Sequence, residues 1–131
     1  MRGHKCLLCL GSNDDDEKHI LNAQIELRKK FPNIQFGTLM KTKPIGDNFH
    51  TSFYNQLAVF YTSLPAEEVR HFFKAIEIQE GRTIAEQSAH SVKLDIDLLK
   101  YGRKVLKKKD MKRDYIIIGI KEFKESFGKM K

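Results

Sequence analysis

The chain has 131 residues, of which 40% are apolar and 31% charged, so we expect one folded domain over residues 1–131 and not a disordered chain. No apolar run reaches the roughly 18 residues of a membrane-spanning helix, and the apolar stretch at residues 6–10 is too short for the core of a signal peptide. A cytoplasmic protein with no membrane partner is therefore expected. The net charge of +7 favours anionic partners such as nucleotides, nucleic acid or acidic surfaces.

The first strand is predicted over residues 5–10, an apolar stretch that ends at Gly11. It contains Cys6 and Cys9, a spacing that also occurs in redox and metal sites. Residues three apart on a strand face opposite sides, so the two sulfur atoms could not meet. We therefore interpret both cysteines as buried thiols.

A helix is predicted next, because apolar residues recur at helical spacing as far as Phe31. Ser12 or Asn13 is the expected N-cap, and the acidic residues 14–17 would lie beside the positive end of the helix. Consecutive side chains fan outward from a helix, which favours this capping role over a metal site. The expected buried stripe is Ile20, Ala23, Leu27 and Phe31.

Two further strands and a second helix follow. Alternating residues predict the strands, and a polar loop over residues 41–52 separates them. The helix is expected to begin near Pro65 and to end at Gly81. The residues that define these elements are Ile34, Phe36, Thr38 and Met40; Asn55, Leu57, Val59 and Tyr61; and Val69, Phe72, Phe73 and Ile76.

The stretch "KLDIDLLKYG", residues 93–102, is predicted as a strand with two neighbouring carboxylates on one face. Asp95 and Asp97 would lie about 6–7 Å apart, with Leu94, Ile96 and Leu98 on the other face. Two like charges at this spacing repel, so we expect a compensating cation. Either a basic side chain such as Lys93 or bound Mg²⁺, which prefers oxygen ligands, would serve.

The last part of the chain is predicted to form a hairpin over residues 101–106 and a buried strand over residues 115–120, "YIIIGI". Seven Lys and Arg residues crowd into residues 103–113, where we expect a solvated loop. The element order is strand, helix, strand, strand, helix, strand, plus one or two extra strands. It predicts an α+β, ferredoxin-like βαββαβ fold: an antiparallel sheet with its helices on one face.

Six motifs in order, "LGSN", "KTKPIG", "FYNQLAVFYTSLPAEEV", "IEIQEGR", "LDIDLLKYG" and "RDYIIIGIKEF", resemble the 6-hydroxymethyl-7,8-dihydropterin pyrophosphokinase family. The resemblance spans residues 7–123. It implies that ATP, as co-substrate, gives its terminal diphosphate to the hydroxymethyl group of a reduced pterin, as in folate biosynthesis. It also implies that Asp95 and Asp97 hold two Mg²⁺ ions and act in catalysis with Arg82, and that Glu77, Arg82 and Arg113 bind the nucleotide.

The resemblance implies a pterin site as well. Asn55 matches the asparagine that reads the hydrogen-bonding edge of the pterin, and Phe53 and Tyr115 match the aromatic residues that sandwich the ring. Thr42, Pro44 and Ile45 fall in the loop that lines the pocket. Without the resemblance, Asn55 reads as the end of a strand, and the two aromatic residues read as core.

Some positions depart from the family pattern. Ile84, Ala89 and Val92 occupy positions where the family has two arginines and a tryptophan, and "LKKKDMK" replaces a Pro-His segment. The chain also ends soon after Phe123, where family members usually continue. Two alternatives to the active enzyme therefore stay open: a descendant that binds a pterin-like ligand without transferring diphosphate, and a nucleic-acid binding module. The latter is disfavoured because the strands lack the aromatic motif of an RNA-recognition domain. Oligomeric state is left undecided.

Overall fold

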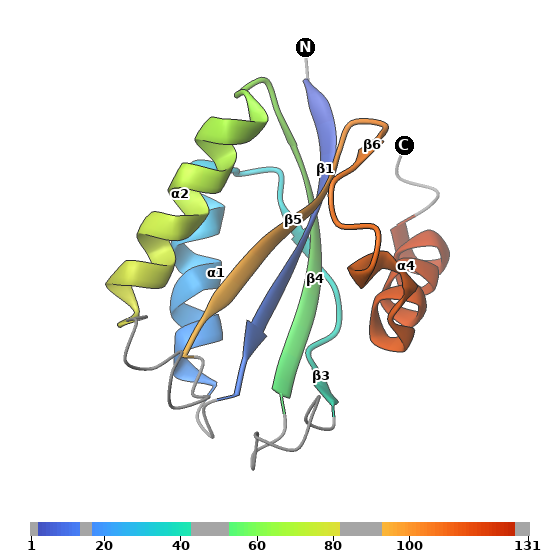
Figure 1. Ribbon diagram of the computed structural model, residues 1–131, viewed down its shortest axis with the longest axis horizontal. Coiled ribbons are helices and arrows are strands. Elements are labelled where there is room, and N and C mark those ends of the chain that lie inside the picture. Colours follow the sequence, from blue (N-terminus) through green and yellow to red (C-terminus); the bar gives the residue numbers. More distant parts are fainter. Residues whose placement is uncertain (1–2, 14–16, 43–52, 82–92, 128–131) are drawn as a thin grey trace.

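The computed structural model describes residues 3–13, 17–42, 53–81 and 93–127, which form one antiparallel sheet with helices on both faces (Figure 1). The strand order is β2-β4-β1-β5-β6, and β3 also pairs with β4. The strands are β1 His4–Ser12, β2 Gln35–Phe36, β3 Met40–Thr42, β4 Phe53–Thr62, β5 Asp95–Tyr101 and β6 Lys104–Val105. The helices are α1 Lys18–Lys30, α2 Ala66–Gln79 and α4 Asp114–Phe127, with a 3₁₀ turn at Asp110–Lys112. No helix among these described segments is long and apolar enough to span a membrane.

The predicted α+β, ferredoxin-like arrangement is confirmed. Helices α1 and α2 lie side by side on one face of the sheet (Figure 1). Between them and the sheet lies the larger apolar core, which includes Leu8 of β1, Phe60 of β4 and Leu98 of β5. Each such side chain contributes about 1.5–3 kcal/mol when it is fully removed from water, so this core holds the two helices in place.

The prediction of a buried strand at residues 115–120 is wrong, because these residues belong to α4. The helix packs on the face of the sheet opposite to α1 and α2 (Figure 1). It buries Ile116 and Phe123 against Leu57 and leaves Ile117 and Ile118 exposed. The β-branched run favoured a strand, but packing at positions seven apart selected the helix.

The second predicted strand is divided into β2 and β3, and its two halves face opposite ways. The N–H and the hydroxyl of Thr38 both donate to the Glu122 carboxylate of α4, at 2.8 and 2.7 Å, so Thr38 leaves the ladder. The pairing with β4 then shifts by one residue, since Phe36 pairs with Ala58 but Met40 pairs with Asn55. A one-residue shift turns a side chain to the other face, which brings Met40 toward α4 while Phe36 packs under α1 and α2.

The start of the first helix also differs from the prediction. Ser12 is the last residue of β1, and α1 begins only at Lys18, after the cap residue Glu17. Glu17 makes no side-chain capping bond, and the first turn contains no acidic residue. The expected N-cap at Ser12 or Asn13 is therefore wrong, because β1 continues its pairing with β4 as far as Ser12. The acidic residues 14–16 lie outside the described residues.

Candidate active site

The carboxylate pair, Asp95 and Asp97, lies at the start of β5 and faces the α4 side of the sheet. The neighbours between and after them, Ile96 and Leu98, pack into the core under α1 and α2, so alternation directs both aspartates to the other face. Both aspartates are half-buried. The expectation that the two carboxylates share one strand face is thus confirmed.

A row of three residues crosses the sheet beside this pair. Asn55 of β4 is paired with Gly11 of β1, and Gly11 is paired on its other side with Asp95 of β5. Adjacent strands lie about 4.8 Å apart, so the backbones of Asn55 and Asp95 are separated by roughly 10 Å. Gly11 contributes no side chain between them: a Cβ built there would meet the Asn55 Oδ1 at 3.4 Å. The amide and the carboxylate therefore flank a strip of sheet with no side chain.

The Asp97 carboxyl group is held in an unfavourable environment for a charge. Burial raises its pKa from the ordinary value of 3.8 to about 8, and a hydrogen bond and the charge of Asp95 add to the effect. Lys107 opposes the shift and Asp110 adds to it more weakly. Without a cation, the Asp97 carboxyl group therefore keeps its proton near neutral pH. A divalent cation bound between the carboxylates would remove the repulsion between Asp95 and Asp97, which contributes to the raised pKa of Asp97.

The apolar floor beside the pair is formed by Cys9, which is paired with Asp97, and by Leu57. Burial, followed by the charges of Asp97 and Asp95, raises the pKa of the Cys9 thiol, so the thiol stays protonated. Burial also raises the pKa of the Cys6 thiol, to about 11. Both cysteines are free and buried, and they belong to the cores on opposite faces, as predicted.

Helix α4 places Tyr115 next to the pair. The helix approaches β4 closely at Gly119, where a Cβ would come within 2.5 Å of the Leu57 side chain. Tyr115, at the first turn, is half-buried against the apolar floor. Burial raises its pKa to about 12, with smaller effects from Cys9, Arg113, Asp110 and Asp97. The phenol therefore stays protonated in the electrostatic neighbourhood of the pair.

The remaining predicted site residues are distributed as follows. Phe53 begins β4, half-buried, and pairs with Thr42 at the end of β3. Arg113 precedes α4, where its Nε donates to Asp110 Oδ1 at 3.2 Å. Arg82, Pro44 and Ile45 lie outside the described residues, as do the substituted positions Ile84, Ala89 and Val92.

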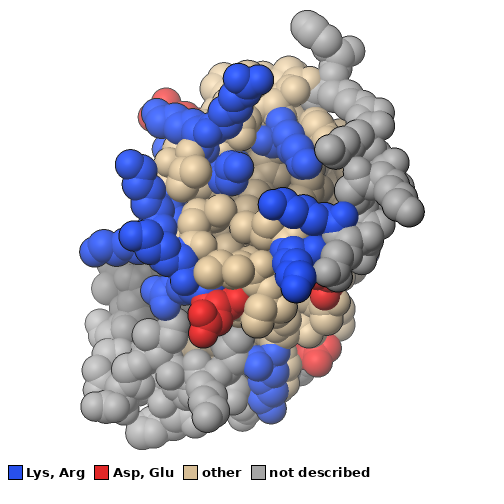
Figure 2. Space-filling model, turned by 90° about the vertical axis from the view of Figure 1, so that its right-hand side faces the viewer, with Lys and Arg blue, Asp and Glu red and all other residues tan. Residues whose placement is uncertain are grey.

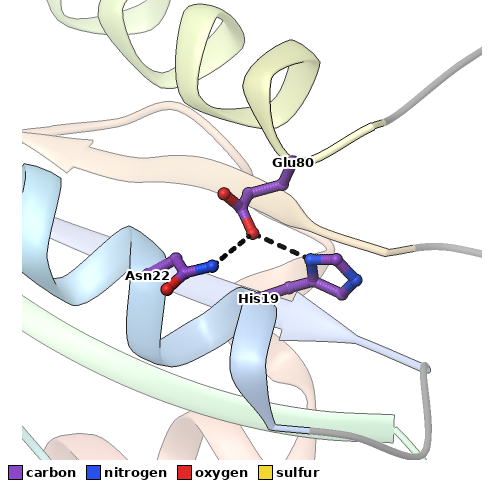
Figure 3. Close-up of polar contacts among 3 residues, drawn as sticks. All are labelled: His19, Asn22 and Glu80. Atoms are coloured by element: carbon purple, nitrogen blue, oxygen red, sulfur yellow. Dashed lines mark hydrogen bonds and ion pairs between the residues drawn. The ribbon is translucent and has the colours of Figure 1, made fainter.

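Glu77 reaches the pair from α2 through the backbone. Its Oε2 accepts the N–H of Ile96, between the two aspartates, at 2.7 Å, and the side chain is buried. One turn later, Glu80 ties α2 to α1: its Oε1 lies 2.8 Å from His19 Nδ1 and accepts the Asn22 amide at 3.1 Å (Figure 3). The last turn of α2 is thus attached to both β5 and α1.

Sequence reasoning missed two residues of this site, Asp110 and Cys9. Asp110 acts on Asp97 from the connection between β6 and α4, as does Lys107 of the basic run that the sequence marked, and Cys9 forms the floor. No local pattern marks Asp110, because it reaches the pair only through the turn after β6. The position of Cys9 could have been found from the strand pairing once β1 and β5 were taken as neighbours.

The α4 side of the molecule is strongly basic. More Lys and Arg than acidic side chains are visible on it (Figure 2). The basic segment, residues 100–113, contains eight Lys and Arg residues and one Asp, which equals the whole net charge of +7. The segment comprises the end of β5, β6 and the 3₁₀ turn, and it adjoins the carboxylate pair through Lys107. Anions approaching this side are therefore attracted toward the basic segment, which adjoins the pair.

Fold and site together define a ferredoxin-like α+β protein with a carboxylate pair on the sheet face that α4 partly covers. The family model of the 7,8-dihydro-6-hydroxymethylpterin-pyrophosphokinases (HPPK) matches residues 7–125, nearly the whole chain. The chain therefore belongs to the HPPK family, as its sequence motifs indicated. A solved structure similar to it is a de novo designed protein with a ferredoxin fold, LFR1 1, with 18% identity, coverage of 79% of this chain and 88% of that chain, and a TM-score of 0.34.

Proposed function

We propose that this protein catalyses the Mg²⁺-dependent transfer of diphosphate from ATP to 6-hydroxymethyl-7,8-dihydropterin, giving AMP, a step of folate biosynthesis. Membership of the HPPK family supports this reaction class. The single observation that carries the proposal for this chain is the row Asn55–Gly11–Asp95 with Asp97 beside it. A flat ring whose edge hydrogen-bonds to the Asn55 amide would extend over Gly11 and bring a substituent to the carboxylates.

The donor set of the pair fits Mg²⁺. Two half-buried carboxylates offer hard oxygen ligands, and Mg²⁺ commonly shares one or two carboxylates with substrate phosphates. Among the described residues there is no cluster of three or more His, Cys, Asp and Glu side chains that could hold a metal. We therefore propose that Asp95 and Asp97 hold two ions together with the triphosphate. Bound Mg²⁺ would supply charge neutralisation on the phosphate oxygens.

In the proposed reaction the hydroxymethyl oxygen forms a bond to the β-phosphorus of ATP. The bond from that phosphorus to the oxygen bridging to the α-phosphorus breaks, AMP leaves with that oxygen, and the hydroxyl proton is released. Such transfers depend on positioning and on charge stabilisation more than on covalent chemistry of the protein. Asn55 would orient the ring edge, and Asp95 and Asp97 would fix the diphosphate end.

The other predicted residues complete the proposed site. We propose that Phe53 and Tyr115 flank the pterin ring: Phe53 lies two residues before Asn55 on the same face of β4, and Tyr115 of α4 packs against the cluster of Cys9 and Leu57. Thr42, Pro44 and Ile45 would line the same pocket. On the nucleotide side we place Arg82 and Arg113, and Lys107 as an additional cation beside Asp97.

An assay of AMP release tests the proposal directly. The protein is incubated with ATP, Mg²⁺ and 6-hydroxymethyl-7,8-dihydropterin, and nucleotides are separated by chromatography. We expect AMP and the pterin diphosphate in equal amounts, and neither product when Mg²⁺ or the pterin is omitted. No AMP at protein concentrations equal to the substrate would overturn the proposal. Calorimetric pterin binding that Asn55→Ala weakens, without AMP, would then support the binding-only alternative, whereas salt-dependent RNA affinity would support a nucleic-acid module.

A further inference from the structure

Among the described residues, no strand pairs with the outer edge of β5 beside the carboxylate pair. Over Asp95–Leu98 the described strands pair with β5 only from the β1 side, and β6 joins its other edge at Lys100 and Tyr101. The Ile96 N–H does not serve the β1 ladder, because it donates to Glu77 Oε2 at 2.7 Å. A side chain of α2 thus accepts the backbone hydrogen bond of Ile96, as a neighbouring strand would do elsewhere in the sheet.

This bond is well suited to fix the backbone between the two aspartates. Glu77 is only 8% exposed, so water competes little for its hydrogen bond to the Ile96 N–H. Over this stretch β1 pairs with one edge of β5, and Glu77 supplies a hydrogen bond at the other edge. The spacing of the two carboxylates follows from the dihedral angles at Ile96, the residue that Glu77 holds.

A second carboxylate lies at the same end of α2. Glu80 bonds to His19 and Asn22, so it joins α2 to α1 and not to β5 (Figure 3). Glu77 and Glu80 are thus two carboxylates on one helix end with different targets. Glu77 holds the strand that carries the carboxylate pair, and Glu80 holds α1.

We infer that Glu77 is a positioning residue for the carboxylate pair, acting through the Ile96 backbone and not as a direct ligand of nucleotide or metal. The inference deepens the proposed function and rests on Asp95 and Asp97 being the metal ligands. It replaces the expectation that Glu77 binds the nucleotide. Outer residues that orient metal ligands typically alter metal affinity by 10–100-fold when they are changed.

Two conservative substitutions separate the effect of side-chain length at position 77 from the effect of its charge. Glu77→Gln keeps an oxygen acceptor at the same distance but removes the negative charge. Glu77→Asp keeps the charge, but it is one methylene shorter and cannot reach the Ile96 N–H without a backbone shift. If Glu77 positions the strand, Glu77→Gln preserves metal binding and Glu77→Asp weakens it. If Glu77 acts by its charge, or as a ligand that needs a carboxylate, the opposite order follows.

The measurement is Mn²⁺ binding to the full chain in the absence of nucleotide, followed by electron paramagnetic resonance of free Mn²⁺. We expect Glu77→Gln to stay within about twofold of the wild type and Glu77→Asp to lose about tenfold in affinity. Glu80→Asp is the matched control, since it shortens the neighbouring carboxylate: it should lower the melting temperature and leave Mn²⁺ affinity unchanged.

Three results would overturn the inference: a larger loss with Gln than with Asp, an equal loss with Glu80→Asp, or wild-type affinity in both Glu77 variants. A parallel binding measurement with metal-free ATP adds a further check. If Glu77 contacted the nucleotide directly, its substitution would weaken that binding too. Failure of the proposed reaction is distinguishable, since it would show as absent AMP release by the wild type, whatever the order of the Mn²⁺ affinities.

Discussion

The two faces of the sheet are filled in different ways. Under α1 and α2, β1 contributes Cys6, Leu8 and Leu10 in succession to one apolar core. On the α4 face, β1 contributes Leu7 and Cys9 to a smaller core and then Gly11, where polar side chains of β4 and β5 take over. The first face is covered by two helices over an apolar core. The second is divided between a helix that is packed on it and a polar strip where we propose that the substrates bind.

The largest effect is expected for the polar strip. Asp97→Asn removes one charge of the carboxylate pair, and Asp95→Asn removes the other. Losing a group that holds charge in the transition state costs about 10²–10³-fold in rate, so either variant should reduce AMP release by at least this factor. Steady-state kcat/KM for both substrates is the measurement. Near-normal rates in both variants would show that the strip is not where the chemistry occurs.

On the apolar face the largest effect should be on stability alone. Phe60 is fully buried and its ring lies 4.4 Å from that of Phe31, centroid to centroid. Phe60→Ala should lower the free energy of unfolding by about 3–5 kcal/mol, measured by urea denaturation. The KM for the pterin should not change at temperatures where the variant is folded. A changed KM would mean that the two faces are not independent.

Gly119→Ala tests the close packing of α4 against β4. Alanine favours a helix over glycine by about 1 kcal/mol, but overpacking of a well-filled core costs about 1–3 kcal/mol. Because the new methyl group would come within 2.5 Å of Leu57, we expect net destabilisation and a raised KM for the pterin through displacement of Tyr115. Ile118→Ala, on the exposed side of the same helix, is the control and should change neither quantity. A stabilised Gly119→Ala protein would contradict this packing.

The smallest effect is expected for the basic segment. Lys107 is exposed, and its influence on Asp97 is screened by water, so Lys107→Ala should raise the KM for ATP only about threefold at low salt. Lys108→Ala, an equally exposed neighbour, should have a smaller effect. The measurement is KM for ATP at two salt concentrations. Equal effects of the two substitutions would mean that the segment acts as a diffuse charge and not through Lys107.

The sequence predicted the apolar face well because its periodicity is regular. The stripe Ile20–Ala23–Leu27 in α1, the stripe Val69–Phe73–Ile76 in α2 and the alternation in β5 each report one face packed against the core. It also placed the carboxylate pair on a strand face. These features depend on residues close together in the sequence, so the periodicity of apolar residues can predict them.

The α4 face was predicted less well, for physical reasons. Residues 115–118 are apolar and mostly β-branched, which favours a strand, and the packing of Ile116 and Phe123 against Leu57 selects the helix instead. The shift between β2 and β3 depends on Glu122, which follows Thr38 by 84 residues. Glu77 was singled out, but its bond to the Ile96 backbone joins two elements whose docking no local pattern specifies.

Thermal unfolding of the wild type and Asp97→Asn at about pH 8, with and without Mg²⁺, tests the carboxylate pair most directly. The folded-state pKa of Asp97 is raised, so its stabilising contribution is complete below the ordinary value near 3.8 and is lost as pH rises toward 8. Without metal, Asp97→Asn should therefore melt a few degrees above the wild type at pH 8, a difference that vanishes near pH 4. Added Mg²⁺ should raise the melting temperature of the wild type only. If Asp97→Asn instead melts lower at pH 8, or Mg²⁺ stabilises both proteins equally, then the two aspartates are not a strained pair that awaits a cation.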